Sequence, residues 1–139
     1  MEQPIFTRQS LGSWSPDPIA RGPFEGMQGG AAAALMCSQI EAMAKTGDWG
    51  SVSSITAHFL KPVPLEELTV AVEPLRRGKR VSIVDATLST SKGLHATARA
   101  TLIAGNFNAA TPVPQPQPSD PVKLPLRIRT APHGGAWMM

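Results

Sequence analysis

The sequence predicts an α+β domain in which an antiparallel β-sheet curls round one buried helix. Residues 29–44 are small and apolar on nearly every side, which is typical of a helix with little contact with water. Four segments with a period of two follow, at residues 51–60, 68–75, 80–90 and 94–104. Short turn signals between several of them favour antiparallel pairing, and the chain lacks the strand–helix–strand rhythm of a parallel sheet.

The boundaries of these elements come from turn and capping residues. Residues 5–14 (IFTRQSLGSW) predict one edge strand, and the proline-containing stretch after them predicts a turn and a loop. The helix is expected to begin at Gln28-Gly29-Gly30 and to end at Thr46-Gly47, where Gly47 takes the left-handed conformation. This helix start is unusual, because two consecutive glycines ordinarily weaken a helix.

Composition shifts predict the domain organisation. We predict one domain over residues 1–109, a linker over residues 110–126 and a C-terminal tail over residues 127–139. Six prolines lie between positions 112 and 125 without periodicity, which is typical of an extended, polyproline-like linker. The tail is too short to fold alone, so we expect it to dock on a partner or to begin a second domain.

Charge and composition exclude several classes of protein. The 139 residues carry a net charge of +3, the Lys and Arg are scattered, and the chain has no Tyr, so we expect no nucleic-acid partner. No apolar run reaches the roughly 18 residues that span a membrane, and the N-terminus has no signal pattern. Cys37 is the single cysteine, which excludes an intrachain disulfide and favours a cytoplasmic location. No Cys/His cluster has zinc spacing, so we expect neither a metal nor a cofactor.

Four stretches, in this order, carry a resemblance to a known family. The chain resembles the hotdog fold, and within it the N-terminal half of the type II acyl-CoA thioesterases, whose members carry two hotdog domains in tandem. The resemblance implies an acyl-CoA substrate and edge-to-edge pairing of hotdog sheets, in a homodimer or within a tandem chain. The stretches are GPFEGMQGGAAAALMC, SITAHFLKPVPLEELTVAVEPLRRGKRVSIVDATL, GLHATARATLI and the proline-rich tail.

The glycine pair has two interpretations that the sequence leaves open. Thioester hydrolysis builds negative charge on the carbonyl oxygen, and a helix N-terminus offers free N–H groups and a positive dipole end. Gly29 and Gly30, with Gln28 before them, are therefore candidates for an oxyanion hole. Alternatively, the two glycines only let the helix pass close under the sheet.

The resemblance also says where a catalytic acid would lie. In one common type of single-domain hotdog thioesterase, a helix residue two turns past the Gly-Gly opening is Asp or Glu, and here that residue is Cys37. In the type II family the acid lies in the C-terminal domain, on the strand before an F-x-[KR]-P motif, and a Thr and a Gln assist it. Aligning on residues 59–62 (FLKP) places Ser54 at the acid position, residues 75–77 near the Thr position, and Thr101 or Leu102 near the Gln position. None of the three family residues is retained, as is expected of a supporting N-terminal domain.

Other polar residues are weighed against ordinary structural roles. Ser54, Thr56 and His58 share one face of a strand and form either a polar surface or part of a site, with Thr56 and His58 as substrate contacts. Glu25 lies in a loop that could border a substrate pocket, and is otherwise a surface carboxylate. Arg77 lies in RRGKR, which could hold the phosphates of coenzyme A but is more commonly a solvated hairpin.

The remaining candidates favour structural roles. Cys37 has no obvious base and is best interpreted as a buried structural thiol. Asp85 and His95 are expected to face solvent or to pair across strands.

Two functional hypotheses follow. The first is an acyl-CoA thioesterase-like protein that hydrolyses acyl-CoA to free acid and CoA, as the supporting half of a tandem or dimeric hotdog enzyme. The second is a non-catalytic acyl-CoA-binding or assembly subunit. A hotdog hydratase is disfavoured, because no Asp/His pair stands at suitable positions.

Overall fold

The computed structural model describes residues 4–105, 128–130 and 136–138. The chain divides into two units after Gly105. The second unit contains two antiparallel strands, β7 (Ile128–Thr130) and β8 (Ala136–Met138). The elements of the first unit are β1 (Phe6–Ser10), β2 (Ser13–Pro16), a short 3₁₀ helix η1 (Pro18–Ala20), α1 (Gly29–Gly47), β3 (Ser51–Phe59), β4 (Leu68–Arg76), β5 (Val81–Thr90) and β6 (Gly93–Ile103).

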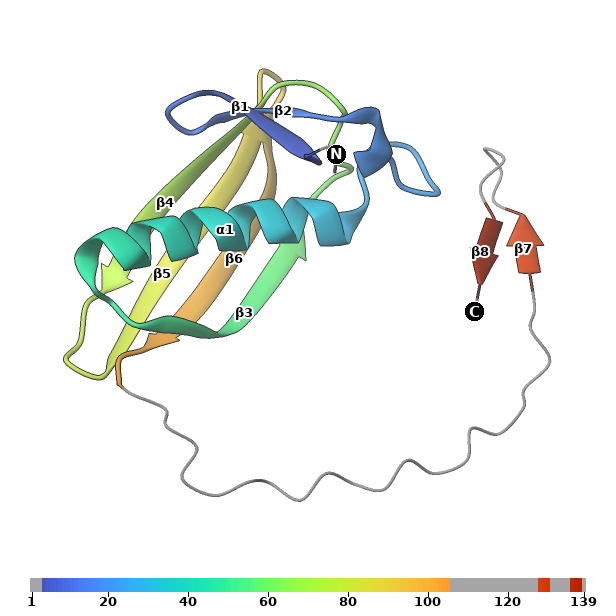
Figure 1. Ribbon diagram of the computed structural model, residues 1–139. Coiled ribbons are helices and arrows are strands. Elements are labelled where there is room, and N and C mark those ends of the chain that lie inside the picture. The colour runs from blue at the N-terminus through green and yellow to red at the C-terminus, as the bar shows by residue number, and fades with distance from the viewer. Residues whose placement is uncertain (1–3, 106–127, 131–135, 139) are drawn as a thin grey trace, which may run out of the picture. The chain divides into compact units, whose positions relative to one another are not determined.

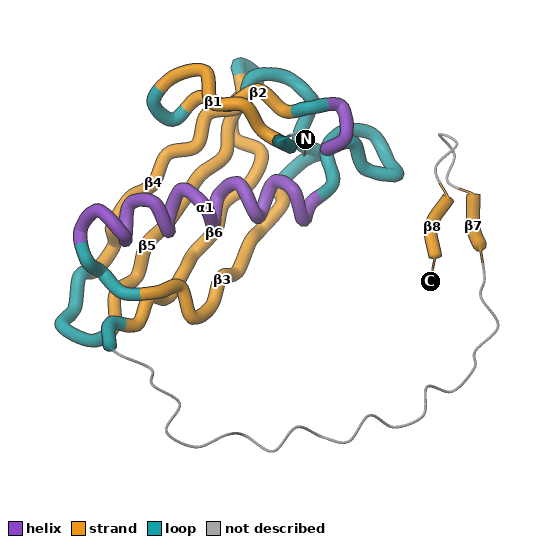
Figure 2. The backbone as a smooth tube through the Cα atoms, viewed as in Figure 1, coloured by secondary structure: helices purple, strands orange, loops and turns teal. Residues whose placement is uncertain are grey.

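The six strands of the first unit form one sheet in the order β1-β2-β4-β5-β6-β3, and every neighbouring pair is antiparallel. The helix α1 lies across one face of this sheet and contacts β3, β4, β5 and β6 (Figures 1 and 2). The predicted antiparallel sheet around one helix is therefore confirmed. Because β3 pairs with β6, residues 60–67 must carry the chain past β6 and β5 before β4 begins.

The core is built from small and aliphatic side chains. Met36 and Ile40 are the largest fully buried side chains of α1, and Leu68, Leu88 and Leu102 are their counterparts on the sheet. Alternate residues of the central strands face the helix, as the period of two predicts. The buried alanines that separate these larger residues are Ala32 and Ala44 on the helix and Ala86, Ala96, Ala98 and Ala100 on the sheet.

One side of α1 is exposed, which differs from the prediction of a helix buried nearly all round. Gly30, Ala34, Ser38, Glu41 and Lys45 form a solvent-exposed stripe along it. The sheet curls over only part of the helix circumference, so the opposite side has no partner within the described residues. In the first half of the helix this stripe carries only Gly30 and Ala34, and such small apolar residues do not mark an exposed side in the sequence.

The N-terminal segment also differs from its prediction. Residues 5–14 form a hairpin rather than one strand, with β1 and β2 joined at Leu11-Gly12. Gly12 has a φ of 79°, a conformation that glycine adopts without strain. This hairpin adds two strands to the edge of β4, pairing only with Leu68 and Thr69.

The end of α1 was predicted correctly in position but not in its capping residue. Gly47 is still helical, and the left-handed residue is Asp48, with a φ of 54°. Aspartate tolerates this conformation better than most residues. A side chain at position 47 would collide with the indole of Trp49, so the glycine is needed for the close approach of that ring.

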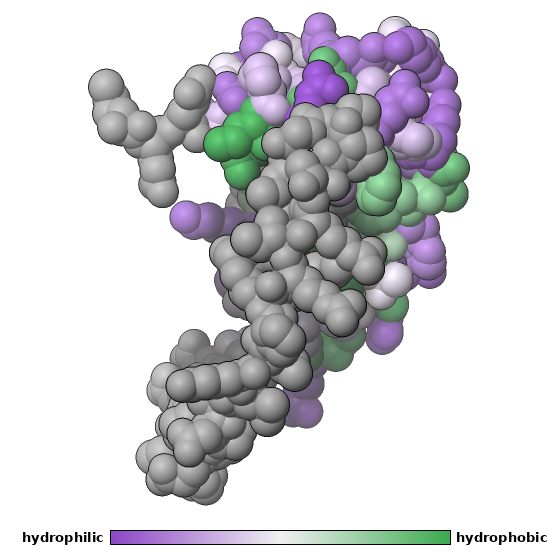
Figure 3. Space-filling view, turned by 90° about the vertical axis from the view of Figure 1, so that its right-hand side faces the viewer, coloured by the Kyte–Doolittle hydropathy of each residue, from purple (hydrophilic) through white to green (hydrophobic). Residues whose placement is uncertain are grey.

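The predicted linker over residues 110–126 lies outside the described residues, and the boundaries of the three predicted segments stay predictions. Within the described residues, no helix is long and apolar enough to cross a membrane. On the face seen in Figure 3, hydrophobic surface occurs in separate patches among hydrophilic surface.

Gly26 provides a stability test of the loop before α1. It has a φ of 97°, and a Cβ atom there would lie 2.6 Å from the carbonyl oxygen of Val63. Gly26→Ala should therefore lower the free energy of unfolding by about 1–3 kcal/mol, measured by urea denaturation.

Gly30→Ala is the matched control, because nothing lies within 4 Å of a Cβ atom at that position. We expect it to change stability by no more than about 0.5 kcal/mol. Equal denaturation midpoints for the two variants would contradict this account of the loop.

Candidate functional site

The N-terminus of α1 has unpaired backbone donors. Gln28 is the N-cap residue, and its side chain makes no capping hydrogen bond. Its carbonyl oxygen accepts the first bonds of the helix, from the N–H groups of Ala31 (3.0 Å) and Ala32 (3.3 Å). The N–H groups of Gly29 and Gly30 precede these bonds and have no acceptor inside the helix. Two donors at the positive end of the helix dipole are thus free to bind a developing negative charge.

The two glycines have different surroundings. A Cβ atom at Gly29 would lie 3.3 Å from the ring of Phe59, the last residue of β3. A Cβ atom at Gly30 would have no neighbour within 4 Å. The close-packing interpretation therefore applies to Gly29, whereas the space beside Gly30 is open to a ligand.

A groove of about 460 Å³ lies beside the loop that leads into α1. Glu25 is exposed on its wall, together with Arg21 and Lys92. The Nδ1 of His95 is 2.7 Å from the carbonyl oxygen of Pro62. The remaining lining residues are Gly26, Pro62, Pro64, Leu65 and His95.

His95 is buried, with 4% of its surface exposed, so the expectation that it faces solvent is wrong. Because the carbonyl of Pro62 can only accept, Nδ1 carries the hydrogen in the neutral ring, and Nε2 accepts from the hydroxyl of Thr90 at 2.9 Å. The carbonyl oxygen of His95 also accepts from the N–H groups of Leu60 and Lys61. His95 therefore forms the expected cross-strand pair, with Thr90 of β5, and also fixes the start of the β3–β4 connection.

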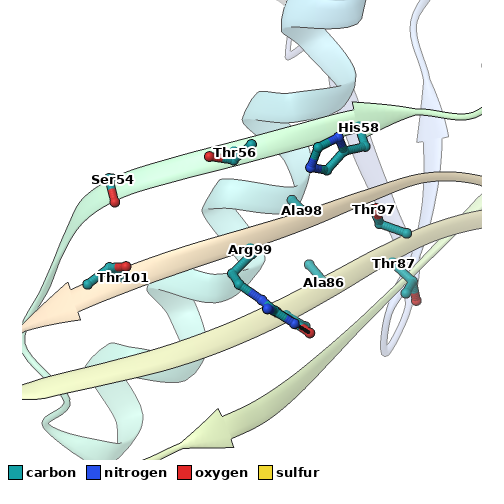
Figure 4. Close-up of a pocket in the computed structure, with 10 residues that line it drawn as sticks. Ser54, Thr56, His58, Ala86, Thr87, Thr97, Ala98, Arg99 and Thr101 are labelled. Atoms are coloured by element: carbon teal, nitrogen blue, oxygen red, sulfur yellow. Dashed lines mark hydrogen bonds and ion pairs between the residues drawn. The ribbon is translucent and has the colours of Figure 1, made fainter.

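A second groove, of about 540 Å³, lies on the face of the sheet turned away from α1 (Figure 4). Ser54, Thr56 and His58 of β3 point into it, so the structure brings these three predicted residues together. The groove continues over β6 and β5, where it is lined by Thr97, Ala98, Arg99, Thr101, Asp85, Ala86 and Thr87.

The strand register places the positions implied by the resemblance in one row. Ser54 pairs with Thr101, Thr101 with Ile83, and Ile83 with Arg76. Directly paired residues of antiparallel strands have side chains on the same face, with Cβ atoms about 5 Å apart. The row thus contains Ser54, Thr101 and Arg76, with Ile83 between Thr101 and Arg76, and it has no carboxylate.

The carboxylate of this groove is engaged in an ion pair. Arg99 donates from Nε to Oδ1 and from Nη2 to Oδ2 of Asp85, both at 2.7 Å. This bidentate hydrogen bond lowers the pKa of Asp85 and raises the pKa of Arg99. A carboxylate with a lowered pKa is a poor general base, so Asp85 does not replace the missing acid.

The sheet separates the two groups of predicted residues. Phe59 and the glycine pair lie on the α1 side, whereas Ser54 points to the opposite side and lies about 17 Å further along β3. Arg77 lies at the other end of α1, which is about 28 Å long. There its Nη2 donates to the carbonyl of Gly47 at 3.0 Å, and its guanidinium lies 5.0 Å from the ring centroid of Trp49.

Cys37 has the properties of a structural thiol. It lies in the middle of α1 and is half-buried. Desolvation, followed by the nearby charge of Glu41, raises the pKa of its thiol. The thiolate that a nucleophile needs is therefore disfavoured. Among the described residues, no group of three or more His, Cys, Asp or Glu could hold a metal ion.

Residues 18–105, well over half of the chain, match the family described as the acyl-CoA thioesterase N-terminal domain. The chain belongs to this family. The match covers α1 and β3 to β6, and therefore both the glycine pair and the row that contains Ser54. A comparison with curated proteins gives no match.

Solved structures share the hotdog fold of this domain. A Bacillus halodurans protein crystallised with CoA is 21% identical, with a TM-score of 0.59 over 66% of this chain and 64% of that chain. A Streptococcus mutans protein bound to acetyl-CoA is 17% identical, with a TM-score of 0.59 over 75% and 90%. A Thermobifida fusca protein described as a candidate thioesterase II is 23% identical, with a TM-score of 0.62 over 89% and 46%. The thioesterase domain thus covers less than half of the Thermobifida protein.

The Asp85–Arg99 ion pair on the outer face predicts how the stability of the fold depends on pH. Because the pKa of Asp85 is lowered in the folded chain, the pair stabilises the fold above about pH 4, the usual range of an unfolded Asp. That stabilisation is lost as the pH falls through the lower folded-state pKa. Arg99→Gln should raise the pKa of Asp85 toward its ordinary value, as measured by NMR titration of the carboxyl carbon.

Arg80→Gln is the control, because Arg80 is exposed and makes no ion pair with Asp85 in the structure. It should leave the titration of Asp85 unchanged. An unaltered midpoint in Arg99→Gln would show that the bidentate contact does not govern this pKa.

Proposed function

We propose that this domain is the supporting half of an acyl-CoA thioesterase, in which acyl-CoA is hydrolysed to free acid and CoA. The observation that carries the proposal is that this domain retains one part of the catalytic machinery, the oxyanion donors, and lacks the other, the carboxylate and its helpers. The helix start retains two N–H donors, at Gly29 and Gly30, for which the described part of the chain offers no acceptor. The row on the outer face has Ser54 where the family resemblance puts a carboxylate. Thr101 and Arg76 of this row lie among the positions, 101–102 and 75–77, near which the resemblance puts the two helpers.

The chemistry assigns a distinct role to each part. Water attacks the thioester carbonyl carbon and gives its proton to a general base. The carbonyl oxygen becomes negatively charged and accepts hydrogen bonds from the N–H groups beside Gly30, which would contribute about 3–4 kcal/mol per donor. The C–S bond then breaks, and the CoA sulfur takes a proton. The general base and its polar helpers, Asp, Gln and Thr, come from a second hotdog domain.

The edges of the sheet support such pairing. β3 forms one edge, nine residues long and without proline, and no described strand pairs with its outer side. At the other side, β4 is paired by β2 only at Leu68 and Thr69, and its free remainder contains Glu73 and Pro74. Charge and proline protect an edge against pairing. A second hotdog sheet, from another copy or from a tandem domain, would therefore continue from β3.

The C-terminal hairpin supports the tandem arrangement. In the first hairpin, Arg8 of β1 pairs with Trp14 of β2. In the second, Arg129 of β7 pairs with Trp137 of β8. A repeated Arg–Trp register after a proline-rich segment is what the first hairpin of a second hotdog domain would show, and this is how we interpret residues 127–139.

The other predicted residues have subsidiary roles in this proposal. Glu25 borders the groove beside the helix start, where it can contact substrate. Thr56 and His58 line the outer groove, and they can contact substrate only while that face is uncovered. Arg77 is held at the far end of α1, and its role in binding phosphate stays a prediction. The cytoplasmic location also stays a prediction.

A non-catalytic acyl-CoA-binding or assembly subunit is the second candidate. The engaged carboxylate of Asp85 favours it, because a chain that cannot activate water can still bind a thioester. The two candidates differ in whether a second domain restores turnover.

The test combines thiol release with thermal shift on residues 1–139 and a panel of acyl-CoAs. Because a general base contributes about 10²- to 10⁴-fold, turnover by this chain alone should lie at least about 100-fold below that of its pairing with a domain that supplies Asp, Gln and Thr. Binding should nevertheless raise the melting temperature, and Gly30→Val should remove this shift by filling the open space at the helix start.

Ala34→Val is the matched control, since it adds the same side chain one turn further along the exposed stripe of α1. Strong, linear hydrolysis by the isolated chain that is abolished by Ser54→Ala or Gln28→Ala would overturn the supporting role. Absence of any thermal shift would leave only the assembly subunit.

A further inference from the structure

The face of β3 to β6 turned away from α1 consists of five rows of paired residues. Alternation and register define the rows, because directly paired residues share a face. From one end of the strands to the other, the rows are Ser51–Ile103–Val81, Ser54–Thr101–Ile83–Arg76, Thr56–Arg99–Asp85–Glu73, His58–Thr97–Thr87–Ala71 and Leu94–Ser89–Thr69.

The composition of this outer face is unusual for a solvated surface. None of these outward positions carries lysine, and the four charged residues, Arg99, Asp85, Glu73 and Arg76, sum to zero. Two of them already neutralise each other in the bidentate pair. Hydroxyl and small side chains fill most of the remaining positions. The absence of lysine is the feature that this face shares with the centre of a protein–protein interface.

One end of the outer face is aliphatic. Val81 pairs with Ile103, and Ile83 lies in the adjacent row. Their strand neighbours Ser82, Val84 and Leu102 are buried, so these three side chains point outward. Val81 keeps 38% of its surface exposed. β-Branched aliphatic residues gain most from such a position when a second surface covers them.

We propose that this outer face binds the same face of a second copy of the chain, around a two-fold axis that runs parallel to the strands between β5 and β6. This axis places Arg99 opposite Asp85 of the second copy, in both directions. It also places Val81 opposite Ile103 and Thr97 opposite Thr87. An axis running across the strands through the central row would place Arg99 on Arg99 and is excluded by like-charge repulsion.

The size of the face suits reversible association. Four strands and about nine residues of length give a patch of roughly 19 by 30 Å, or about 600 Å² on each copy. A standard interface buries about 800 Å² per partner. The contact involves the face of the sheet and not its β3 edge, so it does not rest on the proposed thioesterase function or on edge pairing. It covers Thr56 and His58, which could then not contact substrate.

The test measures the mass of residues 1–139 by sedimentation over a wide range of concentration. The wild-type chain should associate reversibly. Arg99→Asp and Asp85→Arg should each halve the associated mass, with a dissociation constant at least about tenfold higher, because each variant puts like charges across the interface. If β3 edges pair as well, the mass falls from four chains to two instead of from two to one.

An equimolar mixture of the two variants distinguishes loss of the contact between chains from loss of the Asp85–Arg99 pair within one chain. Each variant has lost its internal ion pair, yet across a mixed dimer positions 99 and 85 are again opposite in charge in both directions. The mixture should therefore recover the wild-type mass. Arg80→Asp, which changes an exposed residue off this face, should leave the mass unchanged.

Three results would overturn the proposal: a wild-type mass that does not depend on concentration, single variants with the wild-type mass, or a mixture that stays dissociated. If a variant fails to fold, cross-linking decides. Chains with Thr97→Cys and chains with Thr87→Cys, each in a Cys37→Ser background, should be joined when mixed with a bismaleimide of about 10 Å, the spacing of stacked sheets. Absence of the mixed product would equally exclude the interface.

Discussion

The contact between α1 and the sheet is made by small side chains on both surfaces, and it sets the position of everything else in the domain. Ala32 on the helix and Ala96, Ala98 and Ala100 on β6 are almost completely buried. A larger residue at these positions would push the helix away from the strands, because a packed core has no spare volume. The close approach brings the start of α1 onto the ring of Phe59. The free N–H groups of the helix therefore have a fixed place relative to β3.

The same sheet that holds the helix also divides the chemistry of the domain. Successive residues of β3 point to opposite faces, so Ile55 packs against the core while Ser54 and Thr56 face outward. No movement of side chains can bring Ser54 and the Gly30 N–H to one thioester within a single copy. A hydrolytic site that uses both kinds of group must combine two domains, and this requirement favours the tandem or dimeric arrangement over an independent enzyme.

Local patterns in the sequence predicted the elements well, because the hydrophobic period and the turn residues are properties of short segments of the chain. The four strands and the helix were placed within a residue or two. The capping residue Asp48 was missed because the sequence pattern favours Gly47 as the left-handed residue. Gly47 is a glycine for another reason, the close approach of the Trp49 ring, and propensity alone does not reveal that contact. The burial of His95 was missed for a related reason. Its partners lie in a loop 33 residues earlier in the chain and across a turn.

The candidate site was predictable only in part. The resemblance located Ser54, and the structure adds that Thr101 and Arg76 lie in its row. The ion pair of Asp85 with Arg99 depends on the register of β5 against β6. A bulge between Leu88 and Ser89 shifts this register, so the turn residues alone do not predict it. Phe59 gave no signal of its role, because an exposed aromatic at the end of a strand has many explanations.

The domain offers two surfaces for association, and they do not compete. A partner at the β3 edge continues the sheet in its own plane, whereas a partner on the outer face stacks perpendicular to that plane, so one partner can occupy each surface without displacing the other. Neither surface includes the start of α1. Edge pairing would add strands that carry a second set of catalytic positions. Face pairing would cover the Asp85–Arg99 pair and the row of Ser54, Thr101 and Arg76, which in this chain lacks the carboxylate that hydrolysis needs. Assembly through both surfaces would leave the space beside Gly30 open to a thioester.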